Sequence, residues 1–237
     1  MMPNIMKSYI ERPRVARELY EWVQRVHGEF GKTAEGKSAL RRRSALYLKE
    51  LLEEIWPLAN YALLFFPERS DVRFQPVIGN ESYDALLVDE SGSTLCYFEI
   101  TQALHGEAGY QDRLRREHLE QYGHAPLTGP PLRRDPDSGF IAETLGECVD
   151  HSDAVEITFC QIRAAIEAKA TKVYPANTAL IVEFQGIHLQ QPNDQAALDA
   201  LAKSTLCDLA SRFSELALID EISRFGFRYL IPGRRAA

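Results

Sequence analysis

A pair of β-type runs at residues 81–102, each carrying one carboxylate, constrains the fold of this chain most strongly. Residues 82–88 and 94–101 are rich in β-branched, aromatic and aliphatic side chains, and the polar residues 89–93 between them are typical of a hairpin turn. Asp84 lies in the first run and Glu99 in the second. A carboxylate on a mostly buried strand is costly unless it has a charged partner or a metal ion. Two such groups on adjacent antiparallel strands can converge on one face and bind a hard divalent cation such as Mg²⁺.

The same stretch resembles the core of the PD-(D/E)XK nuclease superfamily, which has the restriction endonuclease-like fold. In that superfamily an Asp on one strand is followed by (D/E)-x-K on the next. Asp84 and Glu99 match the two acids, and Thr101 stands where the Lys is expected. The resemblance implies a metal-dependent nuclease that hydrolyses DNA phosphodiester bonds. It also implies that Asp84, Glu99 and the main-chain carbonyl of Ile100 hold Mg²⁺ (or Mn²⁺), while Gln102 orients the attacking water.

Other elements would complete such a site. In the superfamily a helix before the strands often supplies a further acid, and Glu54 or Glu50 is the candidate here. The alternative is an exposed acidic helix face paired with basic neighbours. In some branches the missing Lys has moved to another element, which makes Lys169 and Lys172 candidates for the catalytic cation. The alternative for both lysines is that they complement the negative end of a helix dipole.

Arginines on the expected helix 110–122 and on the loop after it form the predicted nucleic-acid contact. In the resembling fold this helix lies beside the site and can meet the phosphate backbone, which the planar guanidinium of Arg suits well. The candidates are Arg113, Arg116, Arg133 and Arg134. The alternative is a solvated helix with internal ion pairs, such as Arg113 with Glu117.

The histidines and cysteines of the sequence do not indicate a zinc site. His118 and Tyr122, spaced by four, partly match a Gln-x-x-x-Tyr motif of some branches of the superfamily. His105 and His124 lie on expected loops without an i+4 partner, so we expect them to be surface residues and not metal ligands. The cysteines form no C-x-x-C pair, which predicts reduced thiols and neither a zinc site nor a disulfide framework.

The remaining pattern predicts alternating helices and strands. Helices are expected at 14–27, 39–66 (kinked or split at Pro57), 110–122, 154–173 (capped by Ser152 or Asp153) and 195–216, and further strands at 72–78, 178–184, 217–222 and 225–231. Gly28 and Gly31 are expected to break the first helix, and residues 32–38 and 123–139 are expected to be connections. The fold class is therefore α/β, a mixed central β-sheet flanked by helices, with an N-terminal helical element at 1–38 and the main domain at 39–237.

Composition limits the function classes. The chain has 237 residues, 45% of them hydrophobic, and a formal net charge of −7. This charge does not favour nucleic-acid binding, but local basic patches such as Arg41 to Arg43 can decide it. No apolar run is long enough to cross a bilayer and the N-terminus lacks a signal-peptide core, so we expect a cytoplasmic protein with no membrane partner. A homo-oligomer or a protein partner remains open.

A second function class is open as well. In this alternative, the lack of a Lys at position 101 makes the chain a catalytically inactive relative that binds nucleic acid or a protein partner. Asp84 and Glu99 would then be paired with protein donors and not with metal. Enzymes of other kinds have less support, because the sequence has no glycine-rich phosphate loop, no G-x-S-x-G elbow and no H-E-x-x-H motif.

Overall fold

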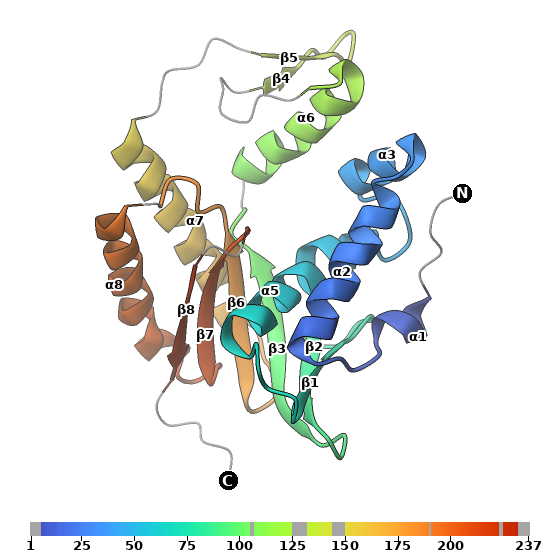
Figure 1. Ribbon diagram of the computed structural model, residues 1–237. Helices are drawn as coiled ribbons and strands as arrows, with labels where there is room; N and C mark the ends of the chain where they lie inside the picture. Colours follow the sequence, from blue (N-terminus) through green and yellow to red (C-terminus); the bar gives the residue numbers. More distant parts are fainter. Residues whose placement is uncertain are drawn as a thin grey trace.

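The computed structural model describes residues 6–104, 107–124, 132–143, 150–189, 191–222 and 225–231. Its centre is a six-stranded sheet in the order β1-β2-β3-β6-β7-β8 (Figure 1). The neighbouring strands β3, β6 and β7 are parallel, and the outer pairs are antiparallel. The strands are β1 (Val72–Pro76), β2 (Ala85–Asp89), β3 (Thr94–Gln102), β6 (Thr178–Phe184), β7 (Glu215–Asp220) and β8 (Gly226–Leu230). The predicted mixed sheet of an α/β fold is confirmed.

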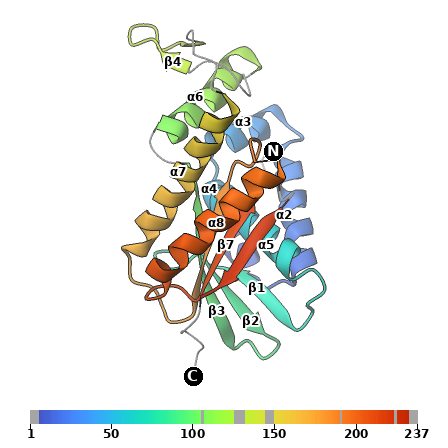
Figure 2. The same ribbon diagram turned by 90° about the vertical axis from the view of Figure 1, so that its left-hand side faces the viewer.

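Helices cover both faces of this sheet. On one face lie α2 (Ala16–Phe30) and α5 (Trp56–Phe65), and on the other lie α7 (His151–Ala170) and α8 (Pro192–Leu209) (Figures 1 and 2). Strand β6 is buried along its whole length, as its continuous apolar sequence predicts. Its Ile181 packs in the cluster with α2 and α5, whereas Leu180 and Val182 pack with α7 and α8. The alternation of side chains along β6 thus joins the two halves of the core.

The N-terminal region is more helical than its glycines indicate. The expected break at Gly28 is wrong, because α2 continues to Phe30, and the expected connection at 32–38 is wrong from residue 34 onward, where α3 (Ala34–Arg42) begins. Phe30 is fully buried and anchors the last turn of α2. Thr33 caps α3, its Oγ1 accepting a 3.0 Å hydrogen bond from the Gly36 N–H. The division into domains at residue 39 stays a prediction, and α3 crosses that position.

The long helix expected at 39–66 is divided in an unexpected place. The chain leaves the helical path at Arg43 and Tyr47, which have left-handed φ angles of 51° and 62°. It then forms α4 (Leu48–Glu50), the π-helical turn η1 (Leu51–Ile55) and α5 without a break. Pro57 lies in the first turn of α5, so the irregular hydrogen bonding falls just before the proline. The π turn buries Leu51 and Ile55 against the sheet.

Other boundaries also differ from expectation. Residues 123–139 are not wholly loop, because β4 (Leu132–Arg134) pairs with β5 (Ile141–Glu143) in a small hairpin beside α6 (Glu107–Tyr122). Asp150 caps α7 in place of Ser152 or Asp153 and accepts a 2.9 Å bond from the Asp153 N–H. Helix α8 ends at Leu209, since the following residues turn into β7. Within the described residues, no helix combines the length and apolarity needed to cross a membrane.

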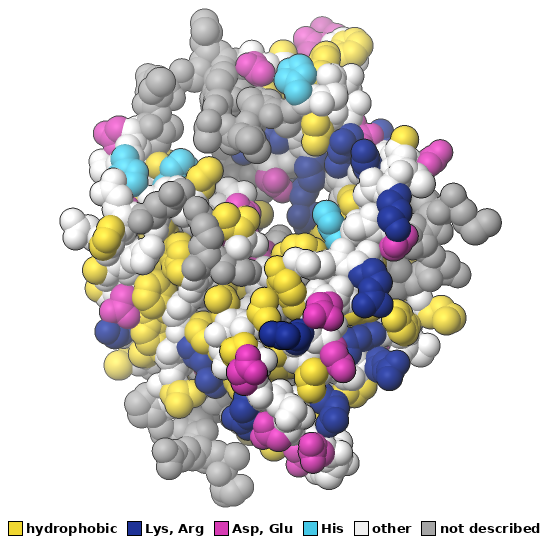
Figure 3. Space-filling model, viewed as in Figure 1, with side chains coloured by type: hydrophobic (Ala, Val, Ile, Leu, Met, Phe, Trp, Pro, Cys, Tyr) yellow, Lys and Arg dark blue, Asp and Glu magenta, His cyan; other side chains and the backbone are white. Residues whose placement is uncertain are grey.

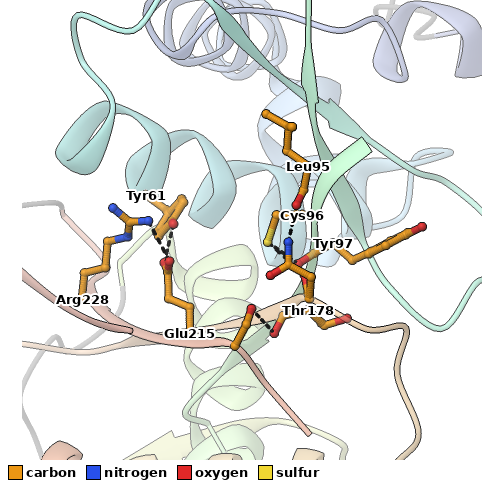
Figure 4. Close-up of polar contacts among 9 residues, drawn as sticks. Tyr61, Leu95, Cys96, Tyr97, Thr178, Glu215 and Arg228 are labelled. Carbon is orange, nitrogen blue, oxygen red and sulfur yellow. Dashed lines mark hydrogen bonds and ion pairs between the residues drawn. The ribbon is translucent and has the colours of Figure 1, made fainter. Parts of the chain in front are cut away.

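A buried polar cluster fastens α5 to the edge of the sheet (Figure 4). Glu215 of β7 is 5% exposed and accepts a 2.5 Å hydrogen bond from the Tyr61 hydroxyl and a 2.8 Å bond from Arg228 of β8. Burial, together with the charge of Glu215, raises the pKa of Tyr61 well above its usual range. The arginine therefore provides the opposite charge beside the buried Glu215 side chain.

Replacing Arg228 with Met should leave the Glu215 carboxylate buried without its cation. We expect the free energy of unfolding to fall by about 3 kcal/mol, within the range seen when one partner of a buried ion pair is removed. Urea denaturation followed by circular dichroism measures the change. Leu230→Ala is the matched control on the same strand, because Leu230 is 70% exposed and its truncation should cost less than about 0.5 kcal/mol. Equal midpoints for the two variants would contradict the assignment.

Candidate acidic site

Asp84 and Glu99 lie close together at the sheet. Ala85 pairs with Phe98 in the register, and the N–H of Asp84, the residue just before β2, donates to the Phe98 carbonyl at 2.7 Å. The charge of Glu99 acts on the Asp84 carboxyl group, as expected for two acids that are near neighbours. Asp84 Oδ2 also accepts a 2.7 Å hydrogen bond from the Ile100 N–H, which holds its carboxylate against β3.

Lys169 reaches this pair of acids from α7. Its Nζ lies 2.5 Å from Oε1 of Glu99, and the Glu99 and Lys169 side chains are 7% and 20% exposed. Position 101 on β3, two residues after Glu99, carries Thr and not Lys. The structure thus brings a lysine ammonium to Glu99 from a helix distant in sequence.

Lys172 lies in a different position from Lys169. It follows the end of α7 and is exposed, and its charge reaches the site only as a weak influence that lowers the pKa of Asp84. Tyr174, which sequence reasoning did not select, lies closer: burial and the charge of Glu99 raise the pKa of its hydroxyl. Of the two candidate lysines, the structure places Lys169 in contact with the acids.

Glu54 enters the same site from the π turn. Together with Asp84 and Lys169 it lines a cavity of about 370 Å³ that also includes Gln102 and Ile100. The Ile100 side chain packs in the core on the α5 face, so its main chain is the part that faces the cavity. Glu53 and Arg43, which line the cavity as well, form an ion pair at its side. The helix thus contributes its acid through the irregular turn that precedes Pro57.

The acids of the site hold more negative charge than the protein neutralises. Burial and the charge of Asp84 raise the pKa of Glu54 to about 8. Burial and the charge of Glu99 raise the pKa of Asp84 to about 6, although the Ile100 N–H and Lys169 act in the opposite direction. A bound cation would stabilise the ionised form of these carboxyl groups, which face one cavity. Their oxygen atoms are suitable ligands for a hard cation.

Gln102 is held in place by a buried acid. Its Nε2 donates a 2.7 Å hydrogen bond to Oε2 of Glu183, a residue of β6 that is 5% exposed. Burial raises the pKa of Glu183 to about 8 despite this hydrogen bond. The side-chain oxygen of Gln102 is therefore left as the acceptor at the cavity wall. The sequence did not indicate Glu183, because a single acid within an apolar strand has no periodic signal.

A basic hollow adjoins the acidic cavity. Its volume is about 470 Å³, and the arginines that line it are Arg41, Arg42, Arg43, Arg113 and Arg116. Arg43 and Arg116 also line the acidic cavity, so the two depressions share a wall. In Figure 3 the Lys and Arg side chains gather beside a hollow in the upper part of the face, over α3 and α6. Sequence reasoning named Arg41 to Arg43 as a patch but did not connect it with α6.

The four predicted nucleic-acid arginines are not equivalent. Arg113 lies 5.7 Å from the centre of the Tyr110 ring, and Arg116 pairs with Asp112 at 2.9 Å. Glu117, expected as a partner of Arg113, instead pairs with Arg134 of the β4–β5 hairpin. Arg133 is exposed on the same hairpin. The structure brings Arg113 and Arg116 to the basic hollow and places Arg133 and Arg134 on the neighbouring hairpin.

A separate group of residues at this end of the molecule could hold a metal ion. One ligand atom each from His118, His124 and Glu143 lies within 4.8 Å of the others. The expectation that His124 is only a surface residue is therefore incomplete. No local sequence pattern indicates this group, because its members come from α6, the segment after it and β5.

Comparisons with known proteins do not add a relative. No family model, no curated protein and no solved structure matches this chain. The function must therefore be argued from the site itself.

The acidic site should make the protein less stable as the pH rises. Since the folded pKa values of Glu54 and Asp84, about 8 and about 6, exceed unfolded values of ~4, the folded chain holds more protons between these limits. Stability is then highest in acid and falls until about pH 8. Glu54→Gln should raise the free energy of unfolding at pH 8.5 by about 2–4 kcal/mol, and leave it nearly unchanged at pH 4.

Urea denaturation at pH 4, 6, 7 and 8.5, with a chelator present, measures this dependence. Between pH 6 and 8 the variant should lose less stability than the wild type, and the slope that remains comes from Glu183, whose pKa is also about 8. Glu21→Gln on the exposed face of α2 is the matched control and should follow the wild-type profile. A Glu54→Gln profile as steep as that of the wild type would show that Glu54 is not the group that titrates.

Proposed function

We propose that the chain is a Mg²⁺- (or Mn²⁺-) dependent nuclease of the PD-(D/E)XK type that hydrolyses DNA phosphodiester bonds. The observation that carries the proposal is the Lys169–Glu99 contact of 2.5 Å beside Asp84. It provides the acid, acid and lysine of the motif with the lysine supplied by α7. This arrangement supports the idea that Lys169 compensates for Thr101.

The donor set fits a hard divalent cation. Asp84, Glu54 and the main chain of Ile100 face one cavity, with Glu99 more deeply buried behind Lys169, and all of them offer oxygen. The raised pKa values of Asp84 and Glu54 express the uncompensated charge that such an ion would neutralise. When bound, the ion would lower the pKa of a water ligand and offset charge on the scissile phosphate.

The protein's own groups would have distinct tasks in the hydrolysis. The water oxygen attacks phosphorus, and the bond from phosphorus to one sugar oxygen breaks. Gln102, fixed by Glu183, would accept a hydrogen bond from the water and orient it. Lys169 has N–H groups beyond the one directed at Glu99 and would stabilise the negative charge that grows on the phosphate oxygens. Thr101 needs no catalytic role in this scheme.

DNA would approach along the basic hollow. Arg41, Arg113 and Arg116 lie on its wall, and Arg116 reaches the acidic cavity. Such a local patch can attract a phosphate backbone even though the chain has a net charge of −7. The hairpin arginines Arg133 and Arg134 would contact the strand farther from the cleavage point.

A second candidate function rests on the same contacts. Asp84 Oδ2 is bonded to the Ile100 N–H and Glu99 Oε1 to Lys169, so protein donors already satisfy one oxygen of each acid. This supports the alternative of a catalytically inactive module that binds nucleic acid or a protein partner. The two candidates differ in whether a divalent ion binds at Asp84 and whether cleavage follows.

Lys169→Met should reduce Mg²⁺- or Mn²⁺-dependent cleavage of plasmid or linear DNA by about 10²–10³-fold, the usual effect of losing one group that stabilises transition-state charge. Asp84→Asn and Glu99→Gln should abolish cleavage. Lys172→Met is the matched comparison. Its cleavage rate should fall by less than about 10-fold, because Lys172 is exposed after the end of α7. Single-turnover rates at saturating metal give the values.

The inactive module would give another pattern. The purified wild type would not cleave DNA or RNA with either ion, and calorimetry would detect no Mn²⁺ binding that Asp84→Asn removes. Equal reductions of the cleavage rate in Lys169→Met and Lys172→Met would contradict the assignment of Lys169 as the compensating cation.

The basic hollow predicts a salt dependence of DNA binding. Arg113→Ala should weaken binding by a similar factor for every DNA sequence and make the slope of log K against log salt shallower by about 1 per lost phosphate contact. Fluorescence anisotropy at several salt concentrations with Ca²⁺ in place of Mg²⁺ measures the slope. Arg25→Ala is the control, because Arg25 is exposed on α2 and does not line the hollow. An unchanged slope for Arg113→Ala would exclude this surface as the DNA contact.

A further inference from the structure

We propose that His118, His124 and Glu143 form a second metal site, suited to Zn²⁺, which fastens the β4–β5 hairpin to α6. One potential ligand atom from each residue lies within 4.8 Å of the others. His118 lies on α6, His124 two residues after the helix, and Glu143 at the end of β5. A metal bound there would link the helix, the loop and the hairpin at one point.

The histidine rings are held as metal ligands are held. Nδ1 of His118 lies 2.9 Å from the carbonyl oxygen of His124, and Nδ1 of His124 lies 3.3 Å from the carbonyl oxygen of Tyr122. Because a carbonyl only accepts hydrogen bonds, each Nδ1 carries the proton, and the lone pair is on Nε2. Ligating histidines commonly donate their other ring N–H to a backbone carbonyl, which fixes both tautomer and orientation.

Packing restricts the same rings. His118 is 5% exposed, its ring centre lies 4.5 Å from that of Tyr122 and 5.2 Å from that of His124. The buried His118 ring is thus held in one orientation beside a second histidine and a carboxylate. These contacts are independent of the spacing of the ligand atoms, and they point to the same use.

The donor set separates this site from the acidic one. Two imidazole nitrogens and a carboxylate oxygen form a set that Zn²⁺ uses with a fourth position left for water. Asp84, Glu54 and the Ile100 carbonyl offer oxygen alone, which favours Mg²⁺ or Mn²⁺. The two sites would therefore favour different metals.

The hairpin needs such a link. Among the described residues, its apolar contact with α6 is the small cluster of Leu114, Leu132 and Ile141. The Gln111 side chain adds hydrogen bonds to the Leu132 N–H at 2.8 Å and to its carbonyl at 3.1 Å. A core of this size gives little stability by itself, and small units of this kind commonly depend on a metal. The same hairpin carries Arg133 and Arg134, so the metal would fix these cations beside the basic hollow.

Zinc binding to the full chain, without an affinity tag, tests the proposal. The background is Asp84→Asn/Glu99→Gln, so that the acidic site cannot supply the signal. We expect one Zn²⁺ per chain by calorimetry and by elemental analysis after dialysis, and a Co²⁺ visible spectrum typical of tetrahedral coordination. His124→Ala and Glu143→Gln, both at exposed positions, should each weaken Zn²⁺ binding by about 100-fold or more.

His188→Ala is the matched control and should bind Zn²⁺ as the background does. Circular dichroism of each variant shows whether the fold persists. His124 and Glu143 are exposed, so the test does not require replacement of the buried His118. Zinc binding that is absent from the background, or that survives both His124→Ala and Glu143→Gln unchanged, would overturn the proposal. Neither result would bear on the nuclease activity, which is measured with Asp84 and Glu99 intact.

Discussion

The structure depends on one buried ion pair, between Lys169 at the end of α7 and Glu99 on β3. Glu99 is nearly inaccessible, and a carboxylate at that depth is expensive unless a cation reaches it. Helix α7 packs its apolar stripe on the sheet, and this packing brings the Lys169 ammonium to Glu99. Under the nuclease proposal, this lysine would supply the charge that the motif places at position 101, where the chain has Thr.

The charged groups around the cavity are unevenly distributed, with acids inside it and arginines on one side. Lys169 compensates Glu99, while burial and the charge of Asp84 raise the pKa of Glu54, and burial and the charge of Glu99 raise the pKa of Asp84. Arginines of α3 and α6 surround the cavity on one side, and Arg43 and Arg116 belong to both depressions. An acidic centre with a basic approach favours a ligand that brings negative charge together with a cation, as a phosphodiester with its metal does. The nuclease proposal uses both halves of this pattern.

Backbone irregularities place several of these groups. The left-handed residues Arg43 and Tyr47 end one helix and start the next, and the π turn before Pro57 carries Glu53 and Glu54 at the cavity. A regular α-helix through this segment would present its acids at another angle. The hairpin β4–β5 similarly brings Glu143 to His118 and His124, which are about twenty residues away in the chain.

The sequence by itself determined the order of elements, the mixed sheet and the pair of acids, because period-2 patterns and an apolar strand such as 178–184 are local signals. It also predicted that Asp84 and Glu99 can point from one face, but the strand register that brings them together comes from the tertiary structure. Only the tertiary structure decided between Lys169 and Lys172, joined Arg41 to Arg43 with α6, and gathered His118, His124 and Glu143. These outcomes depend on helix packing, a π turn and a short hairpin, whose energies come from contacts between residues distant in the chain.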